Sequence, residues 1–203
     1  MSERIDVVAR IPTCKDLYDT IKQQSEMLTN AKLIEFIYVS ALKASAAVNR
    51  NDCLNNIKSE LVIMLDDDIT GFYPGWDADL IQPLIENDNI SIVSARLMNS
   101  DTTYANVMHD NFIYVNGYHR SPINLVPTAG IAFRPNGIKF DENYIKASFE
   151  DTDWCKQISQ RYPHMYTVIN NNCKLIHLNE MKFQVGEAWN HNRSYYISKW
   201  GSL

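Results

Sequence analysis

The sequence predicts an α/β domain with a mostly parallel central sheet and helices on its faces. Two observations support this fold class. Short apolar runs with β-branched residues alternate with segments of helical periodicity over residues 5–95, and no Gly/Ser-rich linker divides the chain. Its 203 residues are enough for one domain with a substantial core. We therefore expect a single domain over residues 1–203, with halves at 1–98 and 99–186 and a C-terminal segment at 187–203.

The first half of the chain alternates strands with helices. Strands are expected at Ile5–Ile11, where Pro12 stops the run, and at Leu33–Val39, Leu61–Leu65 and Ile90–Ala95. Helices are expected at Asp16–Leu28, Ala44–Ile57 and Pro74–Glu86, where apolar residues recur at helical spacing. This order is typical of a parallel sheet.

The second half has a different pattern. Residues 99–127 are polar and turn-rich, except for an apolar piece at 112–115. Further strands are expected at Ala129–Phe133, Tyr166–Ile169 and Lys174–His177, and a helix is expected at Glu150–Arg161. This half is therefore expected to extend the same sheet in an α+β manner.

Three consecutive aspartates, Asp66, Asp67 and Asp68, follow the apolar run Leu61–Leu65. Open α/β sheets bind ligands at the carboxyl ends of their strands. Adjacent carboxylates repel one another, and a hard cation such as Mg²⁺ or Mn²⁺ relieves this repulsion. The alternative is a solvated acidic turn that caps the next helix. The position directly after a buried strand favours the metal site.

A second acidic group stands at the start of the helix expected at 150–161. Its members are Glu150, Asp151 and Asp153. Acidic residues are favoured at a helix N-terminus, which accounts for one or two of them. A carboxylate beside aromatic residues such as Phe149 and Trp154 is partly desolvated, which raises its pKa and suits it to general-base chemistry.

Two basic side chains extend this pattern. His177 ends an expected strand; it is either a structural residue or a neutral nitrogen ligand to a metal held by Asp68. Arg50 is either a helix-surface residue or a group that holds a phosphate or pairs with Asp66. The sequence has no glycine-rich phosphate loop of the common types, so a bound nucleotide would be held by metal and side chains.

Together these segments resemble glycosyltransferases of the GT-A fold, the Rossmann-like fold of nucleotide-diphospho-sugar transferases, and family 2 in particular. The matching segments are Ile11-Pro12-Thr13, Arg50-Asn51, Asp66-Asp67-Asp68, Pro74-Gly75-Trp76, Thr128–Phe133, Phe140-Asp141-Glu142, Glu150–Asp153 and His177. They cover residues 5–178 in the family's order. The chain departs from the family after the second strand, where Ser40–Lys43 replaces an acidic pair that contacts the nucleotide base.

The resemblance implies transfer of a sugar from a nucleotide diphosphate, a UDP-sugar being favoured, to an acceptor hydroxyl with inversion. It implies Mn²⁺ or Mg²⁺ held by Asp66, Asp68 and His177, and donor contacts from Ile11, Thr13, Arg50, Asp66 and Asp67. Asp151 is the implied general base, with Asp153 as the alternative, and Glu150 or Asp153 would orient the acceptor or Asp151 itself. Residues 187–203 mix cationic and aromatic groups and form either a lid over the diphosphate or a packed terminal helix.

Composition narrows the function classes. A net charge of −5 argues against a nucleic-acid-binding protein. The sequence shows neither a membrane span nor a secretory signal, and its four cysteines lack C-x-x-C spacing, so we expect a cytoplasmic location. The chain is short for the family and is expected to be a minimal catalytic domain, or one domain of a longer transferase. The alternatives are a nucleotidyltransferase, a metal-dependent phosphoesterase and a catalytically silent domain that binds sugar or nucleotide.

Overall fold

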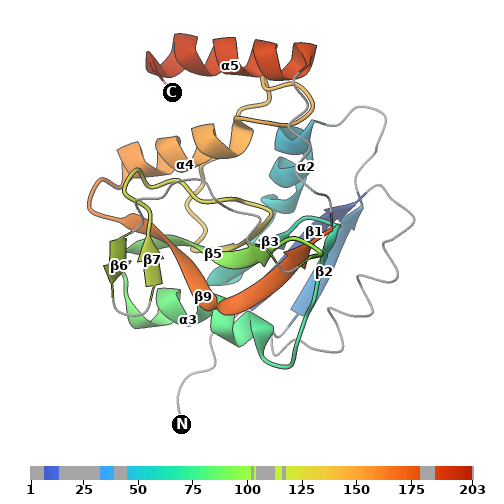
Figure 1. Ribbon diagram of the computed structural model, residues 1–203, viewed down its shortest axis with the longest axis vertical. Coiled ribbons are helices and arrows are strands. Elements are labelled where there is room, and N and C mark those ends of the chain that lie inside the picture. The colour runs from blue at the N-terminus through green and yellow to red at the C-terminus, as the bar shows by residue number, and fades with distance from the viewer. Residues whose placement is uncertain are drawn as a thin grey trace.

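A nine-stranded mixed sheet forms the centre of the protein (Figure 1). The structure is a computed structural model and describes residues 7–13, 33–38, 45–101, 103, 113–115, 118–178 and 186–202. The strands are β1 (Val7–Thr13), β2 (Leu33–Tyr38), β3 (Leu61–Leu65), β4 (Ile69–Thr70), β5 (Ile90–Met98), β6 (Ile113–Val115), β7 (Tyr118–Arg120), β8 (Gly130–Phe133) and β9 (Tyr166–His177). The helices are α2 (Ala46–Cys53), α3 (Trp76–Glu86), α4 (Glu150–Arg161) and α5 (Glu187–Trp200).

The strand order is β2-β1-β3-β8-β5-β9-β7-β6, and the short β4 pairs with β9 outside this path. β1 pairs in parallel with both β2 and β3. β8 is antiparallel to both of its neighbours, β3 and β5, so β5 runs in the direction of β3. β9 in turn is parallel to β5. The predicted mostly parallel sheet is therefore confirmed, and β1, β3, β5 and β9 end at the same edge.

Helices cover both faces of the sheet, as expected. α3 lies on one side, α2 and α4 lie on the other, and α5 lies beyond α4 (Figure 1). Alternate residues of β3 enter two separate core clusters. On the α3 side these are Leu61, Ile63 and Leu65, and on the α4 side they are Val62 and Met64. All five are buried, because side chains of a strand alternate between faces and both faces here are covered.

Several element boundaries differ from the prediction for physical reasons. β1 continues through Pro12 to Thr13. β1 pairs with β3 only as far as Arg10 and beyond that point pairs with β2 alone, so a proline without an N–H is tolerated there. The two strands expected at 166–169 and 174–177 form the single strand β9, in which a register shift against β5 after Ala95 absorbs the polar residues between them.

Other differences concern helices and strands that were not predicted, or that fall outside the described residues. The segment at 187–203, which had no assigned element, contains α5. β4 and β7 were not expected, and the helix predicted at 16–28 lies outside the described residues. In the described part of the chain, no helix is both long and apolar enough to cross a membrane.

Candidate active site

The short strand β4 brings the end of β3 and the end of β9 together. The Asp66 N–H donates to the Ala129 carbonyl at 2.8 Å, which fixes the turn after β3. Ile69 then pairs with His177 in the antiparallel β4–β9 ladder. The Leu178 N–H donates to the Asp68 carbonyl at 3.0 Å. These backbone contacts place His177 beside Asp68, although the two are far apart in the sequence.

Asp66, Asp68 and His177 form a candidate metal group. One ligand atom from each residue lies within 4.8 Å of the others. The Nε2 atom of His177 is 3.1 Å from Oδ1 of Asp68. Burial lowers the pKa of His177, but the hydrogen bond and the charge of Asp68 outweigh burial and raise it above its usual value. Two carboxylates and one imidazole are a donor set that suits Mn²⁺ or Mg²⁺, and the residues predicted to bind metal therefore do lie together.

Arg50 of α2 connects this group to the second acidic motif. Its Nη1 atom donates to Oε1 of Glu150 at 2.7 Å, and its Nη2 atom donates to both carboxylate oxygens of Asp66 at 3.2 Å. The Arg50 side chain is only 9% exposed, so the surface-residue interpretation was wrong and the pairing with Asp66 is present. A single guanidinium thus joins the end of β3 to the start of α4.

Contacts at both ends of α2 and within it hold Arg50 in place. The Ser45 side chain caps the N-terminus of the helix by accepting from the Val48 N–H. The buried Arg10 of β1 donates to the Cys53 carbonyl at the other end. The buried Asn51 bonds both backbone groups of Phe140 through its amide, at 2.8 and 2.9 Å.

Glu150 is the first residue of α4 and is buried, with 3% of its surface exposed. Its Oε1 atom accepts from Arg50, whereas its Oε2 atom is buried and has no hydrogen-bond partner among the residues that the structure describes. Burial and the neighbouring charge of Asp151 raise the pKa of Glu150 to about 7, although Arg50 acts in the opposite direction. Glu150 can therefore exchange a proton near neutral pH.

The other two carboxylates of the motif have different surroundings. Asp151 is partly exposed, and among the described residues the hydrogen bonds to it come from the N–H and hydroxyl of Thr152, both to Oδ1. Asp153 is fully buried and accepts from Trp200 Nε1 at 2.6 Å and from Lys199 Nζ at 2.9 Å. This contact between Asp153 and α5 was not predicted from the sequence. Orientation of the acceptor or of Asp151 by Asp153 stays a prediction.

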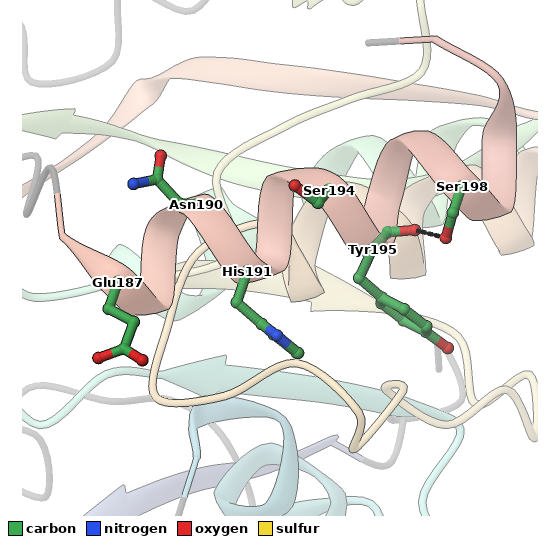
Figure 2. A pocket seen from close by; sticks show the side chains of 6 residues that line it. All are labelled: Glu187, Asn190, His191, Ser194, Tyr195 and Ser198. Atoms are coloured by element: carbon green, nitrogen blue, oxygen red, sulfur yellow. Dashed lines mark hydrogen bonds between the residues drawn. The ribbon is translucent and has the colours of Figure 1, made fainter.

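The C-terminal segment adopts the packed-helix alternative in this structure. Tyr195 and Lys199 of α5 both donate to Oδ2 of Asp141, at 2.9 and 2.7 Å. Figure 2 shows a surface depression lined by one face of α5, formed by Glu187, Asn190, His191, Ser194, Tyr195 and Ser198. Of the described residues, those that line this depression all belong to α5, and they do not include the metal group. Closure of α5 over a diphosphate stays a prediction.

The structure describes only part of the remaining residues that were predicted to contact the sugar donor. Ile11 and Thr13 form the carboxyl end of β1 beside β2, and their side chains are outside what the structure describes. Asp67 is buried within the aspartate triplet, next to Asp66 and Asp68. Contact of these three residues with a nucleotide stays a prediction.

Comparison with known proteins identifies the fold. No protein-family model matches the sequence, and no curated protein is similar to it in sequence. Among solved structures, glucosyl-3-phosphoglycerate synthase from Mycobacterium tuberculosis with Mn²⁺, UDP-glucose and phosphoglyceric acid matches with a TM-score of 0.68 at 10% identity, covering 98% of this chain and 81% of that chain. Its complex with Mg²⁺ and UDP matches with a TM-score of 0.66 at 10% identity, covering 98% and 80%.

A further solved structure, described only as a mycobacterial protein, has a TM-score of 0.66 at 11% identity and covers 98% of this chain and 76% of that chain. Likeness at this level of identity establishes the fold. The predicted GT-A glycosyltransferase fold is therefore confirmed.

Proposed function

We propose that this protein is a metal-dependent glycosyltransferase that moves a sugar from a nucleotide diphosphate, with UDP-sugars favoured, to an acceptor hydroxyl. The proposal depends chiefly on one observation, the convergence of Asp66, Asp68 and His177 at the sheet edge where this fold binds ligands. Because one fold hosts many activities, the site must support the assignment. The Mycobacterium tuberculosis structures support it as well, because they hold Mn²⁺ or Mg²⁺ with UDP or UDP-glucose on the same fold.

Asp66, Asp68 and His177 would hold Mn²⁺ or Mg²⁺, which supplies positive charge to the departing diphosphate. Arg50 adds a fixed positive charge beside Asp66 and keeps that carboxylate oriented. Ile11, Thr13, Arg50, Asp66 and Asp67 are the proposed donor contacts.

Asp151 is the proposed general base. Because Thr152 occupies its Oδ1 atom, its Oδ2 atom is the one that accepts the proton of the acceptor hydroxyl. Glu150 is buried immediately beside it and keeps the start of α4 joined to Arg50. A base that activates the acceptor hydroxyl for direct attack gives inversion at the anomeric carbon.

A donor screen tests this function. Nucleotide release is measured from UDP-, GDP- and dTDP-sugars with Mn²⁺, in the presence of hydroxyl acceptors that include 3-phosphoglycerate, the class of acceptor bound by the Mycobacterium tuberculosis enzyme. We expect acceptor-dependent release of UDP, lost in both Asp68→Ala and Asp151→Asn. Asp88→Ala is the matched control, because the Asp88 side chain is exposed and pairs only at the surface with Arg134.

Three outcomes would contradict the proposal and indicate an alternative. Hydrolysis of simple phosphate esters without sugar transfer would indicate a phosphoesterase. Release of pyrophosphate from nucleoside triphosphates would indicate a nucleotidyltransferase. Sugar-nucleotide binding without turnover under all these conditions would indicate a silent binding domain.

A further inference from the structure

The segment that leads into α4 has an unusual backbone. Three of its residues, none of them glycine, have positive φ angles, with values of 56° at Lys146, 97° at Ser148 and 69° at Phe149. Side chains on such residues clash with the backbone, so this conformation persists only where surrounding contacts impose it. Glu150 and Asp151 follow directly, as the first two residues of α4.

The side chain of Asn192, on α5, supplies the contacts that impose this conformation. Asn192 is fully buried. Its Nδ2 atom donates to the carbonyls of Ile145, Ala147 and Ser148 at 2.8, 3.2 and 3.0 Å. Its Oδ1 atom accepts from the Ile145 N–H at 2.9 Å. One amide therefore contacts four backbone groups of the segment, and because Nδ2 has only two hydrogens, one of them is shared between two of the three carbonyls.

Two other contacts hold the same segment. The Ala46 N–H, at the start of α2, donates to the Lys146 carbonyl at 2.6 Å. The Phe149 ring packs against Trp189 and Tyr196 of α5, with ring centroids 5.8 and 5.6 Å away. The segment is thus held between α2, which carries Arg50, and α5, which carries Asn192.

The start of α4 depends on this segment for its position. Among the described residues no side chain caps the helix, and its N-cap residue is Phe149 itself, in the left-handed conformation. The Phe149 carbonyl accepts from the Asp153 N–H at 2.8 Å, which links the segment to the first turn. A shift of residues 145–149 would therefore move the carboxylates of Glu150 and Asp151.

We infer that Asn192 is a positioning residue of the active site, and that through it α5 holds residues 145–149 in the conformation that places Glu150 and Asp151 for catalysis. The catalytic part of this inference rests on the proposed function. The group of Asp66, Asp68 and His177 is held by β3, β4 and β9, and Arg50 links it to Glu150, so loss of Asn192 should affect the base side of the site more than the donor side.

The test compares Asn192→Ala with Asn190→Ala, the same substitution at an exposed position on the same helix. Three quantities are measured for each variant: UDP affinity with Mn²⁺ by calorimetry, the rate of UDP release from UDP-glucose, and amide hydrogen exchange of residues 145–151. For Asn192→Ala we expect unchanged UDP affinity, a rate reduced on the order of 100-fold because reacting groups are misplaced, and faster exchange in the segment. Asn190→Ala should match the wild type in all three.

An unchanged rate in Asn192→Ala, or an equal loss of rate and UDP affinity, would overturn the inference. A wild-type protein that neither binds UDP nor releases it would contradict the proposed function instead. In that case the exchange measurement alone decides whether Asn192 holds the segment, and equal exchange in both variants would show that it does not.

If Asn192→Ala does not fold, the comparison is made in a Lys146→Gly/Ser148→Gly background. Glycine adopts positive φ angles without steric cost, and both replaced side chains are exposed. We expect Asn192→Ala to fold in this background. We also expect its rate of UDP release to fall by less than the roughly 100-fold expected when the segment is strained. A protein that still fails to fold would overturn the link between Asn192 and the strained backbone.

Discussion

Arg50 and Glu150 form a buried ion pair, with 2.7 Å between Nη1 and Oε1, that joins α2 to the first residue of α4. Their side chains are only 9% and 4% exposed. Arg50 also bonds Asp66 at the end of β3. The proposed metal side and the proposed base side of the site are therefore connected through one side chain.

Replacing Arg50 with methionine should destabilise the protein strongly. The substitution keeps much of the volume but removes the hydrogen-bonding partner of the buried Glu150 and of Asp66, at an expected cost of about 3–5 kcal/mol. Chemical denaturation measures this cost. The double variant Arg50→Met/Glu150→Gln should recover part of it, because the buried acid that lost its partner is replaced by a neutral amide.

The exposed pair of Arg134 and Asp88 provides the comparison, since Arg134→Met removes the same charge at the surface. It should cost no more than about 1 kcal/mol. Equal costs for Arg50→Met and Arg134→Met would show that burial of the Arg50 pair has no energetic consequence.

Glu150 should make stability depend on pH. Its pKa is about 7 in the folded protein and near 4.5 in the unfolded chain. Between pH 4.5 and pH 7, Glu150 therefore keeps a proton in the folded protein that it has lost in the unfolded chain. The stability contributed by this group is therefore fully present below pH 4.5 and is lost as pH rises through 7. Glu150→Gln removes this dependence.

The free energy of unfolding of Glu150→Gln, relative to wild type, should therefore rise by on the order of 1–3 kcal/mol between acidic and mildly alkaline pH. Urea denaturation of both proteins across this range measures the difference. A difference that stays constant with pH would mean that Glu150 titrates at its ordinary value.

Gly71 should be essential for the geometry of the metal group. It follows β4 with a φ of 76°, and a Cβ there would lie 3.0 Å from Cγ1 of Ile176, the residue before His177. Gly71→Ala should cost about 1–3 kcal/mol of stability and weaken Mn²⁺ binding, because β4 or β9 must shift.

Gly137 is a close control for this prediction. Its φ is 75°, and a Cβ added there would meet no atom within 4 Å. Gly137→Ala therefore carries the same backbone strain without the clash and should leave Mn²⁺ affinity unchanged. Metal titration of the two variants distinguishes the effects, and equal Mn²⁺ affinity in both would rule out the proposed dependence on β4.

The prediction that residues 187–203 form a lid can be tested by a separate binding measurement. Arg193 and Lys199 carry the positive charges of this segment, and Lys199 is already paired with Asp141 and Asp153, so Arg193 is the residue to test. If α5 closes over the donor, Arg193→Ala should weaken UDP binding about tenfold while leaving uridine binding unchanged, because only UDP carries the phosphates. Calorimetry with both ligands measures this. Equal UDP affinity in the variant and the wild type would leave α5 with the packing role alone.

The sequence was most informative where a local pattern determines the structure. Leu61–Leu65 and Glu150–Arg161 were predicted with the bounds that the structure shows, because apolar runs and helical spacing depend on neighbouring residues. Asp66, Asp68 and His177 were also expected to meet, because the resemblance to family 2 glycosyltransferases implied a shared metal, and the structure does bring them together.

Features that depend on distant contacts were not predictable in this way. The two residues of β4 form a strand only because they pair with β9. The polar residues near Asn170 separated two predicted strands. In the structure they belong to the single strand β9, which shifts its register against β5 at this point. Asn192 is one of several polar residues of α5, and nothing in the local sequence distinguishes it as the one that bonds Ile145 and Ser148. The same holds for the contact between Asp153 and Trp200.

Metal-dependent binding of a nucleotide diphosphate at Asp68 is tested most directly by isothermal titration of UDP, with and without Mn²⁺, into the wild type, Asp68→Ala and Asp88→Ala. We predict that the wild type and Asp88→Ala bind UDP only when Mn²⁺ is present, and that Asp68→Ala does not bind it at all. UDP binding that is independent of Mn²⁺, or equal in Asp68→Ala and the wild type, would contradict the assignment of Asp66, Asp68 and His177 as the metal site of a glycosyltransferase.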